Sequence, residues 1–133
     1  MSDFSFPKKE RLKQQKAIQA IFAARQSLGS YPIRIFYRLQ PRAEGEPAIL
    51  QGVSVAKRKF KKAPDRNLLK RRLREAYRLN KPHWLASLPN ENLQLQMMWV
   101  YLGHKAEPLS SIQKAAEKSR RRLQQKLAEE ATF

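Results

Sequence analysis

The chain has 133 residues, which suits one domain, and its 28 Lys and Arg against 11 Asp and Glu give a net charge of +17. This excess favours polyanionic partners, either nucleic acid or an anionic membrane surface. The absence of cysteine excludes disulfides, thiolate nucleophiles and cysteine-based zinc sites. No apolar run approaches the ~20 residues that span a bilayer. We expect one domain over residues 1–133, ordered over about 6–128, in the cytoplasm.

The first predicted element is a helix over residues 14–25, because side chains recur there at the spacing of one helical face. That face consists of Ile18, Ile21, Phe22 and Arg25. Residues 1–13 lack periodicity and are expected to form an extended lead-in. After the helix, Gly29 and Pro32 interrupt regular structure.

Two strands are predicted next, over residues 33–39 and 48–57, separated by a loop over 40–47. The first strand alternates, so that one face is apolar while the other combines an aromatic ring with two cations. The apolar face consists of Ile33, Ile35, Tyr37 and Leu39, and the mixed face of Arg34, Phe36 and Arg38. An antiparallel hairpin is the expected pairing of the two strands.

A strongly basic segment over residues 57–81 contains only two acids, Asp65 and Glu75. Pro64 and Asp65 mark a helix start, with Asp65 as the expected N-cap and the helix running to about Asn80. At 100° per residue the helix has an apolar stripe and, about a quarter turn away, a cationic stripe. The apolar stripe is Leu69, Leu73, Ala76 and Tyr77, and the cationic stripe is Asn67, Lys70, Arg71, Arg74 and Arg78.

The last two predicted elements are a strand over residues 93–105 and a final amphipathic helix with Ser110 or Ser111 as its N-cap. The inner stripe of this helix is Ile112, Ala116, Ser119, Leu123 and Leu127. The succession of helix, two strands, helix, strand and helix predicts an α+β class. We expect a single-domain α/β sandwich with a small mixed sheet and helices packed on it.

Residue patterns typical of catalysis are scarce in this sequence. His83 and His104 lie far apart without acidic partners, and the four glycines form no phosphate-binding loop. We therefore predict no catalytic side chain and no metal site on the protein.

The cationic stripe can be a solvated helix face or a nucleic-acid-binding surface. The second interpretation is favoured because too few acids are present for i,i+4 pairing, so neighbouring cations repel one another. The strand face with Arg34, Phe36 and Arg38 suits single-stranded bases, through stacking beside phosphate contacts. Phe22, on the first predicted helix, can line a binding groove together with this strand face, or it can pack in the core. The run Arg120–Arg122 is interpreted as a solvated helix face.

The stretch "DRNLLKRRLREAY" at residues 65–77 resembles the signature helix of the bacterial ribonuclease P protein subunit. In that family an Arg-Asn-Arg signature leads into a helix of the form Ile-Lys-Arg-x-x-Arg-Glu-x-x-Arg. The preceding "GVSVAKRK" and the early "RLKQQKAIQAIF" are similar to its strand and its aromatic lead-in. Two positions depart from the pattern: Leu68 stands at the third signature position and Ile18 at the first aromatic position.

The resemblance implies a ribosomal-protein-like sandwich with a left-handed strand-helix-strand crossover. It implies that a ribonuclease P RNA, which holds Mg²⁺, cleaves precursor tRNA, and that no protein partner is required. The residues implied to bind that RNA are Arg66, Asn67, Lys70, Arg71, Arg74 and Arg78. Those implied to line a cleft for the single-stranded 5′ leader are Ile18, Phe22, Arg34, Phe36, Lys57, Arg58 and Lys59.

Three other functions are consistent with the charge pattern. A structural RNA-binding protein without a catalytic partner is the first, and a duplex-DNA-binding module that inserts residues 66–80 as a recognition helix is the second. Binding to a membrane surface is the least favoured, because no helix places bulky aromatic residues opposite its cations.

Overall fold

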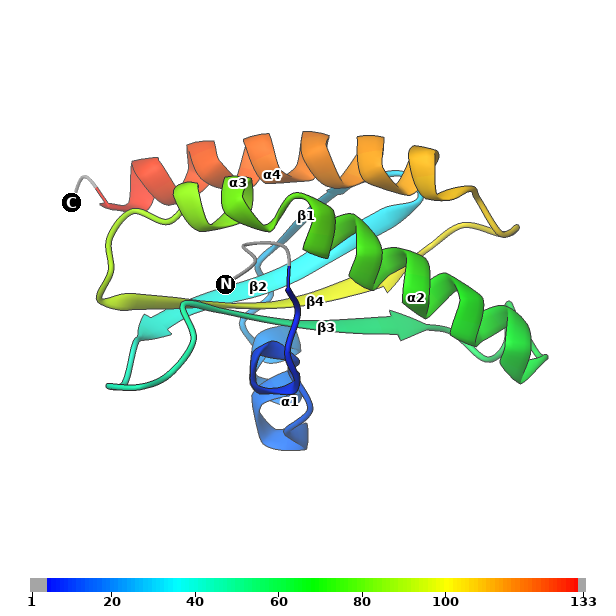
Figure 1. Ribbon diagram of the computed structural model, residues 1–133, viewed down its shortest axis with the longest axis horizontal. Helices are drawn as coiled ribbons and strands as arrows, with labels where there is room; N and C mark the ends of the chain where they lie inside the picture. Colours follow the sequence, from blue (N-terminus) through cyan, green and yellow to red (C-terminus); the bar gives the residue numbers. More distant parts are fainter. Residues whose placement is uncertain (1–4, 132–133) are drawn as a thin grey trace.

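The computed structural model describes residues 5–131, which form one four-stranded sheet covered by helices (Figure 1). The elements in chain order are a 3-10 helix η1 (Lys8–Glu10), α1 (Gln15–Ala23), β1 (Ser27–Ser30), β2 (Ile33–Pro41), β3 (Ile49–Val55), α2 (Ala63–Leu79), α3 (Lys81–Ala86), β4 (Leu93–Tyr101) and α4 (Leu109–Ala131). The predicted α+β class is confirmed.

The strand order is β1-β2-β4-β3, so the predicted hairpin between β2 and β3 is wrong. Strand β2 pairs antiparallel with both β1 and β4, whereas β3 pairs in parallel with β4, where Gly52 lies opposite Met98. Strand β4 takes the central position because both of its faces are largely buried, as its nearly continuous apolar sequence requires. The parallel pairing of β3 and β4 needs a long crossover, which α2 and α3 supply.

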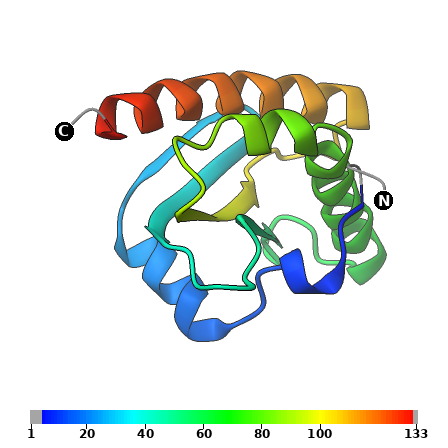
Figure 2. The same cartoon turned by 60° about the vertical axis from the view of Figure 1, so that its left-hand side comes forward.

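The helices lie on both faces of the sheet (Figures 1 and 2). Helices α2 and α4 pack against each other on one face, and α1 contacts β2 and β4 from the other. The alternation predicted for β2 is confirmed, because Ile33, Ile35 and Tyr37 are buried in the main core beneath α2 and α4. The intervening Arg34, Phe36 and Arg38 therefore point to the α1 face of the sheet.

Several element boundaries differ from the sequence prediction, and strand β1 forms where Gly29 was expected to interrupt regular structure. Helix α2 begins at Ala63, so Asp65 lies in its first turn and is not the N-cap. Pro64 is tolerated in this turn because a backbone N–H there would have no partner within the helix. Helix α4 begins at Leu109, and its first turn already uses the Pro108 carbonyl, so neither Ser110 nor Ser111 is the N-cap. Strand β4 ends at Tyr101 because that side chain bonds the following turn through Lys105 and Glu107.

The N-terminal lead-in is fixed against α3 by a buried ion pair. Lys81 Nζ lies 2.5 Å from Glu10 Oε1 and donates to the Ser5 carbonyl at 2.9 Å. Next along the chain, Arg11 forms a parallel bridge to Gln51 of β3. The lead-in that was predicted to be extended is therefore a short 3-10 turn held beside α2, and it contributes side chains to the surface described next.

Candidate nucleic-acid interface

A cationic hollow of about 450 Å³ lies between α2 and the N-terminal lead-in. It is lined by Phe6, Arg11, Asn67, Lys70, Arg71, Arg74, Glu75 and Arg78. The hollow therefore brings together the whole cationic stripe predicted from the sequence. It also adds two residues from the lead-in.

The apolar stripe of α2 fixes the direction in which the cationic stripe points. Leu69, Leu73, Ala76 and Tyr77 are fully buried against the sheet and α4, as predicted. Because residues of one helix are separated by 100° per position, burial of this stripe leaves the cations at its side, where α2 borders the lead-in. The Tyr77 ring packs edge-on against Phe6 with centroids 5.2 Å apart, which joins the lead-in to the helix.

Part of the positive charge of the hollow is compensated within the protein. Arg78 Nε donates to Glu75 Oε1 at 2.8 Å and Nη2 donates to Oε2 at 2.9 Å, one turn apart on α2. The hydrogen bond from Arg78 lowers the pKa of Glu75 against the opposing effect of burial. The same bond raises the pKa of Arg78. This pair is therefore fully ionised at neutral pH.

No acidic side chain among residues 5–129 forms an ion pair with the remaining cations of the hollow. Burial, and then repulsion from the Arg11 guanidinium, lower the pKa of Arg74. Within residues 5–129, whose side chains are described, Lys70 and Arg71 form no hydrogen bond or ion pair. Like charges crowded at one surface without counter-charges raise the energy of the free protein, and an approaching polyanion relieves that repulsion.

Arg66 is the one predicted RNA-contact residue outside the lining of the hollow. Its Nη1 donates to the carbonyls of Phe60 and Lys61 at 2.8 and 2.9 Å. Arg66 thus holds the basic loop between β3 and α2 against the first turn of the helix, which positions that loop.

The residues assigned to a second site, on the α1 face, fall into two groups. Phe22 of α1 packs on Phe36 of β2 with ring centroids 4.9 Å apart, and Ile18 is partly buried beside them. Phe22 is 38% exposed, so it is not a core residue. On the same strand face Arg34 is exposed and donates through Nε to Ser27 Oγ at 3.0 Å. These residues form an exposed aromatic surface with a cation on the same strand.

The second group follows β3 in a turn. Lys57 and Arg58 are exposed, and Lys59 Nζ donates to the Leu102 carbonyl at 2.9 Å, which ties the turn to the end of β4. Val55 of β3 lies opposite Tyr101 of β4, so this turn is at the same end of the sheet as Arg34. The three cations therefore lie beyond the end of β3, at the end of the sheet where Arg34 begins the α1-facing side of β2.

Sequence reasoning missed Arg11 and Phe6. The Arg11 guanidinium lies 5.3 Å from the Phe6 ring centre and lines both the cationic hollow and a second cleft on the α1 face. Both residues lie in a segment without periodicity, where sequence provides no helical or strand face. Only the tertiary contact with α2 brings them to the site.

The comparison with protein families decides the assignment. The family model described as Ribonuclease P matches residues 6–124, nearly the whole described chain. The chain belongs to the ribonuclease P protein family. Membership of this family implies a role in processing the 5′ end of tRNA together with a ribonuclease P RNA.

Curated relatives of this ribonuclease P protein carry the name ribonuclease P protein component. The relative from Porphyromonas gingivalis is 31% identical over 116 residues, which cover 87% of this chain and 84% of the relative. The relative from Photorhabdus laumondii is 38% identical over 80 residues, 60% of this chain and 64% of that protein.

Solved structures share the fold of this ribonuclease P protein. The RNase P protein from Staphylococcus aureus aligns with a TM-score of 0.64 at 21% identity, covering 90% of this chain and 93% of that chain. The protein from Thermotoga maritima aligns with a TM-score of 0.63 at 21% identity, covering 84% and 96%. None of the helices described in this ribonuclease P protein is long and apolar enough to cross a membrane.

Proposed function

We propose that this chain binds the catalytic RNA of ribonuclease P through the cationic hollow, and the 5′ leader of precursor tRNA through the α1 face. The observation that carries the proposal is that Lys70 and Arg71 line the hollow without an ion pair to any described residue. Phosphates neutralise such charge and release bound counterions, so the affinity falls as salt rises. A folded RNA presents the density of phosphates that this surface needs.

The Phe22 and Phe36 pair supports leader binding on the opposite face of the sheet. A partly exposed aromatic ring beside cations is suited to unpaired bases, because every base has a π-face for stacking. A duplex does not offer these faces, so the α1 surface favours a single strand. An exposed stacking surface therefore favours leader binding over the duplex-DNA alternative.

We propose that the Mg²⁺ of the reaction is held by the RNA and not by this chain. Magnesium prefers oxygen ligands in near-octahedral geometry. Among the described residues the only carboxylate that lines the hollow is Glu75, and it already accepts two hydrogen bonds from Arg78. Among the residues described, no group of three His, Asp or Glu side chains is placed to hold a metal ion. The donor set of the hollow therefore suits phosphate and not a cation.

Reconstitution with a bacterial ribonuclease P RNA tests the proposal. At low Mg²⁺ the wild-type chain should increase cleavage of precursor tRNA, and a Lys70→Glu/Arg71→Glu variant should lose this increase together with RNA affinity. A Lys118→Glu/Lys126→Glu variant on the exposed side of α4 carries the same change in net charge and is the matched control. Equal losses in both variants would mean that only net charge matters, and no stimulation by the wild type would favour a structural RNA-binding protein.

A further inference from the structure

The turn between β1 and β2 displays the most exposed large apolar side chain among the described residues. Tyr31 is 64% exposed, whereas the three other tyrosines of the chain are buried. Leu102, which follows β4 and is 38% exposed, lies beside this turn, because its backbone N–H donates to the Pro32 carbonyl at 2.7 Å. Two of the four exposed large apolar side chains described therefore adjoin at one end of the sheet. We refer to Tyr31 and Leu102 together as the apolar platform.

The backbone that carries the apolar platform is fixed by contacts from α4 and from the turn after β3. Arg122 Nη1 of α4 donates to the Gly29 carbonyl at 2.5 Å, and Lys59 Nζ donates to the Leu102 carbonyl at 2.9 Å. Gly29 leaves no room for a side chain, since a Cβ there would lie 2.5 Å from the Ile33 carbonyl oxygen across the hairpin. A ring held on such a turn loses little conformational entropy when it binds a partner.

The surroundings of the apolar platform are cationic. Three segments meet here, residues 27–34, 57–62 and 102–106, and none of them contains an acid. Arg122 lies on one side of the platform, at the β1–β2 turn, and Lys59 lies on the other, at the end of β4. An aromatic face for a base with cations beside it for phosphates suits unpaired RNA. The core of a protein–protein interface is instead depleted of charged residues, above all of Lys.

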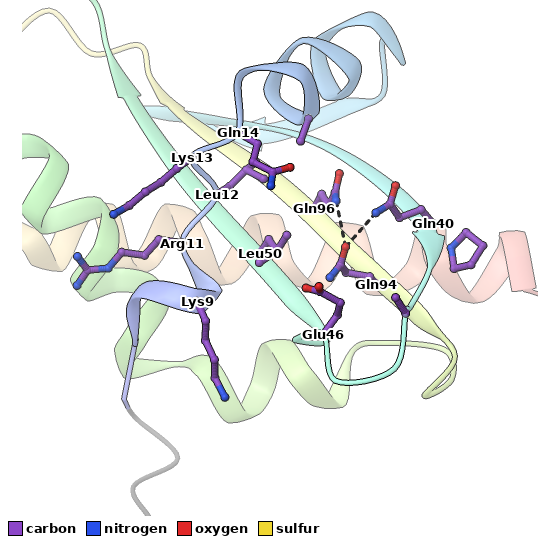
Figure 3. Close-up of a pocket in the computed structure, with 13 residues that line it drawn as sticks. Lys9, Arg11, Leu12, Lys13, Gln14, Gln40, Glu46, Leu50, Gln94 and Gln96 are labelled. Carbon is purple, nitrogen blue, oxygen red and sulfur yellow. Dashed lines mark hydrogen bonds between the residues drawn. The ribbon is translucent and has the colours of Figure 1, made fainter.

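The apolar platform lies on the side of the sheet that carries α2 and α4. Burial raises the pKa of Tyr101, and the nearby Tyr31 phenol contributes to the rise. Tyr101 belongs to the main core beneath α2 and α4, so Tyr31 is at the edge of that core. A cleft on the α1 face lies at the opposite ends of β2 and β4, where Gln40, Gln94 and Gln96 are joined by hydrogen bonds (Figure 3). The platform is therefore separate from the α1 surface that is proposed to bind the leader.

We propose that the apolar platform stacks an unpaired nucleotide of the ribonuclease P RNA. The inference rests on the proposed binding of that RNA and adds a second contact outside the cationic hollow. The base lies on the Tyr31 ring and against Leu102, and its flanking phosphates meet the cations on either side. Because a helical stem hides the faces of its bases, the platform selects an unpaired position in the folded RNA.

Binding of the chain to a bacterial ribonuclease P RNA tests the platform. Tyr31→Ala should weaken this binding by about 5- to 100-fold, the range expected when one stacked base is lost. Tyr31→Trp should keep the affinity, because its ring offers a larger stacking surface. The salt dependence should be the same in Tyr31→Ala as in the wild type, since stacking releases no counterions. Leu102→Ala should weaken binding by a smaller factor, whereas Leu85→Ala, equally exposed on α3, should not.

A single introduced cysteine locates the stacked nucleotide, because the chain has no cysteine of its own. An iron chelate that generates hydroxyl radicals is tethered to Tyr31→Cys, at saturating protein, in the holoenzyme bound to precursor tRNA. It should cut the ribonuclease P RNA within an unpaired segment. Cleavage confined to the leader would assign the platform to the substrate, and cleavage confined to paired RNA would exclude a stacked base. Either result overturns the inference.

The outcomes separate this inference from the proposed function. If Tyr31→Ala binds the RNA as tightly as the wild type while Lys70→Glu/Arg71→Glu loses affinity, the platform is wrong and RNA binding by the hollow stands. If the wild-type chain does not bind the RNA, both proposals fall. The thermal midpoint of Tyr31→Ala should match that of the wild type, because the side chain is mostly exposed. A lowered midpoint together with full affinity in Leu102→Ala would mean that Tyr31 supports the fold only.

Discussion

The Phe22 ring of α1 packs on the Phe36 ring of β2 with centroids 4.9 Å apart and planes inclined by 59°. Among the elements described, α1 is the only α-helix on the face of the sheet opposite α2 and α4. The contact joins this helix to the central strand β2. Because Phe22 remains 38% exposed, the pair combines a structural contact with an accessible aromatic face.

Replacing Phe22 with Ala should weaken binding of leader-bearing precursor tRNA by about 5- to 100-fold and leave mature tRNA nearly unaffected. A base stacked on an aromatic side chain contributes ~1–3 kcal/mol. Leu85→Ala is the matched control, since Leu85 is also 38% exposed but lies on α3. Equal losses for the two RNAs would show that Phe22 supports packing only.

Replacing Arg71 with Ala should reduce the salt dependence of RNA binding by about one unit of log affinity per log salt. Each phosphate neutralised by a cation releases counterions, which sets that slope. Titration with ribonuclease P RNA over a range of salt concentrations measures it. Lys126→Ala on α4 should leave the slope unchanged, and an unchanged slope in Arg71→Ala would place Arg71 outside the interface.

Replacing Glu75 with Gln should tighten binding of the ribonuclease P RNA by about two- to five-fold at low salt. The carboxylate now neutralises Arg78, and its removal frees that guanidinium for phosphate. The expected gain is small because water screens an ion pair that is as exposed as this one. Weaker binding would indicate that Glu75 orients Arg78 for its RNA contact.

The Glu117–Arg120 pair on α4 should make stability depend on pH in the acid range. The hydrogen bond from Arg120 holds the pKa of Glu117 below its ordinary value of 4.5. A carboxyl group with a lowered pKa in the folded state contributes stability that is complete above about pH 4.5 and lost as pH falls further. As pH falls over that range, the midpoint temperature of thermal unfolding should decrease less steeply in Glu117→Gln than in the wild type.

Replacing Lys81 with Met should destabilise the chain by about 3 kcal/mol, because it leaves Glu10 buried without its partner. The two side chains are only 10% and 13% exposed. The double variant Lys81→Met/Glu10→Gln should recover most of the loss in urea unfolding. Additive losses in the double variant would mean that Lys81 acts mainly through the Ser5 carbonyl.

The composition and periodicity of the sequence were sufficient for the α2 surface. Leu69 and Tyr77 are buried and Lys70 and Arg71 point to the hollow because a helix fixes the angle between its residues, whatever surrounds it. The alternation of β2 was sufficient for the same reason, since successive side chains of a strand point to opposite faces.

Tertiary structure alone decided which segments meet. The sequence favoured a β2–β3 hairpin, but β4 lies between these strands because its apolar residues need cover on both faces. Arg11 lies beside Arg74 in a lead-in that contacts distant segments through the Lys81–Glu10 ion pair and the Arg11–Gln51 bridge. The hydrogen bonds among Gln40, Gln94 and Gln96 likewise depend on β2, β4 and the loop before β3 meeting at one end of the sheet. Local geometry sets the angle between near neighbours, whereas long-range pairing depends on how all the apolar surfaces are buried together.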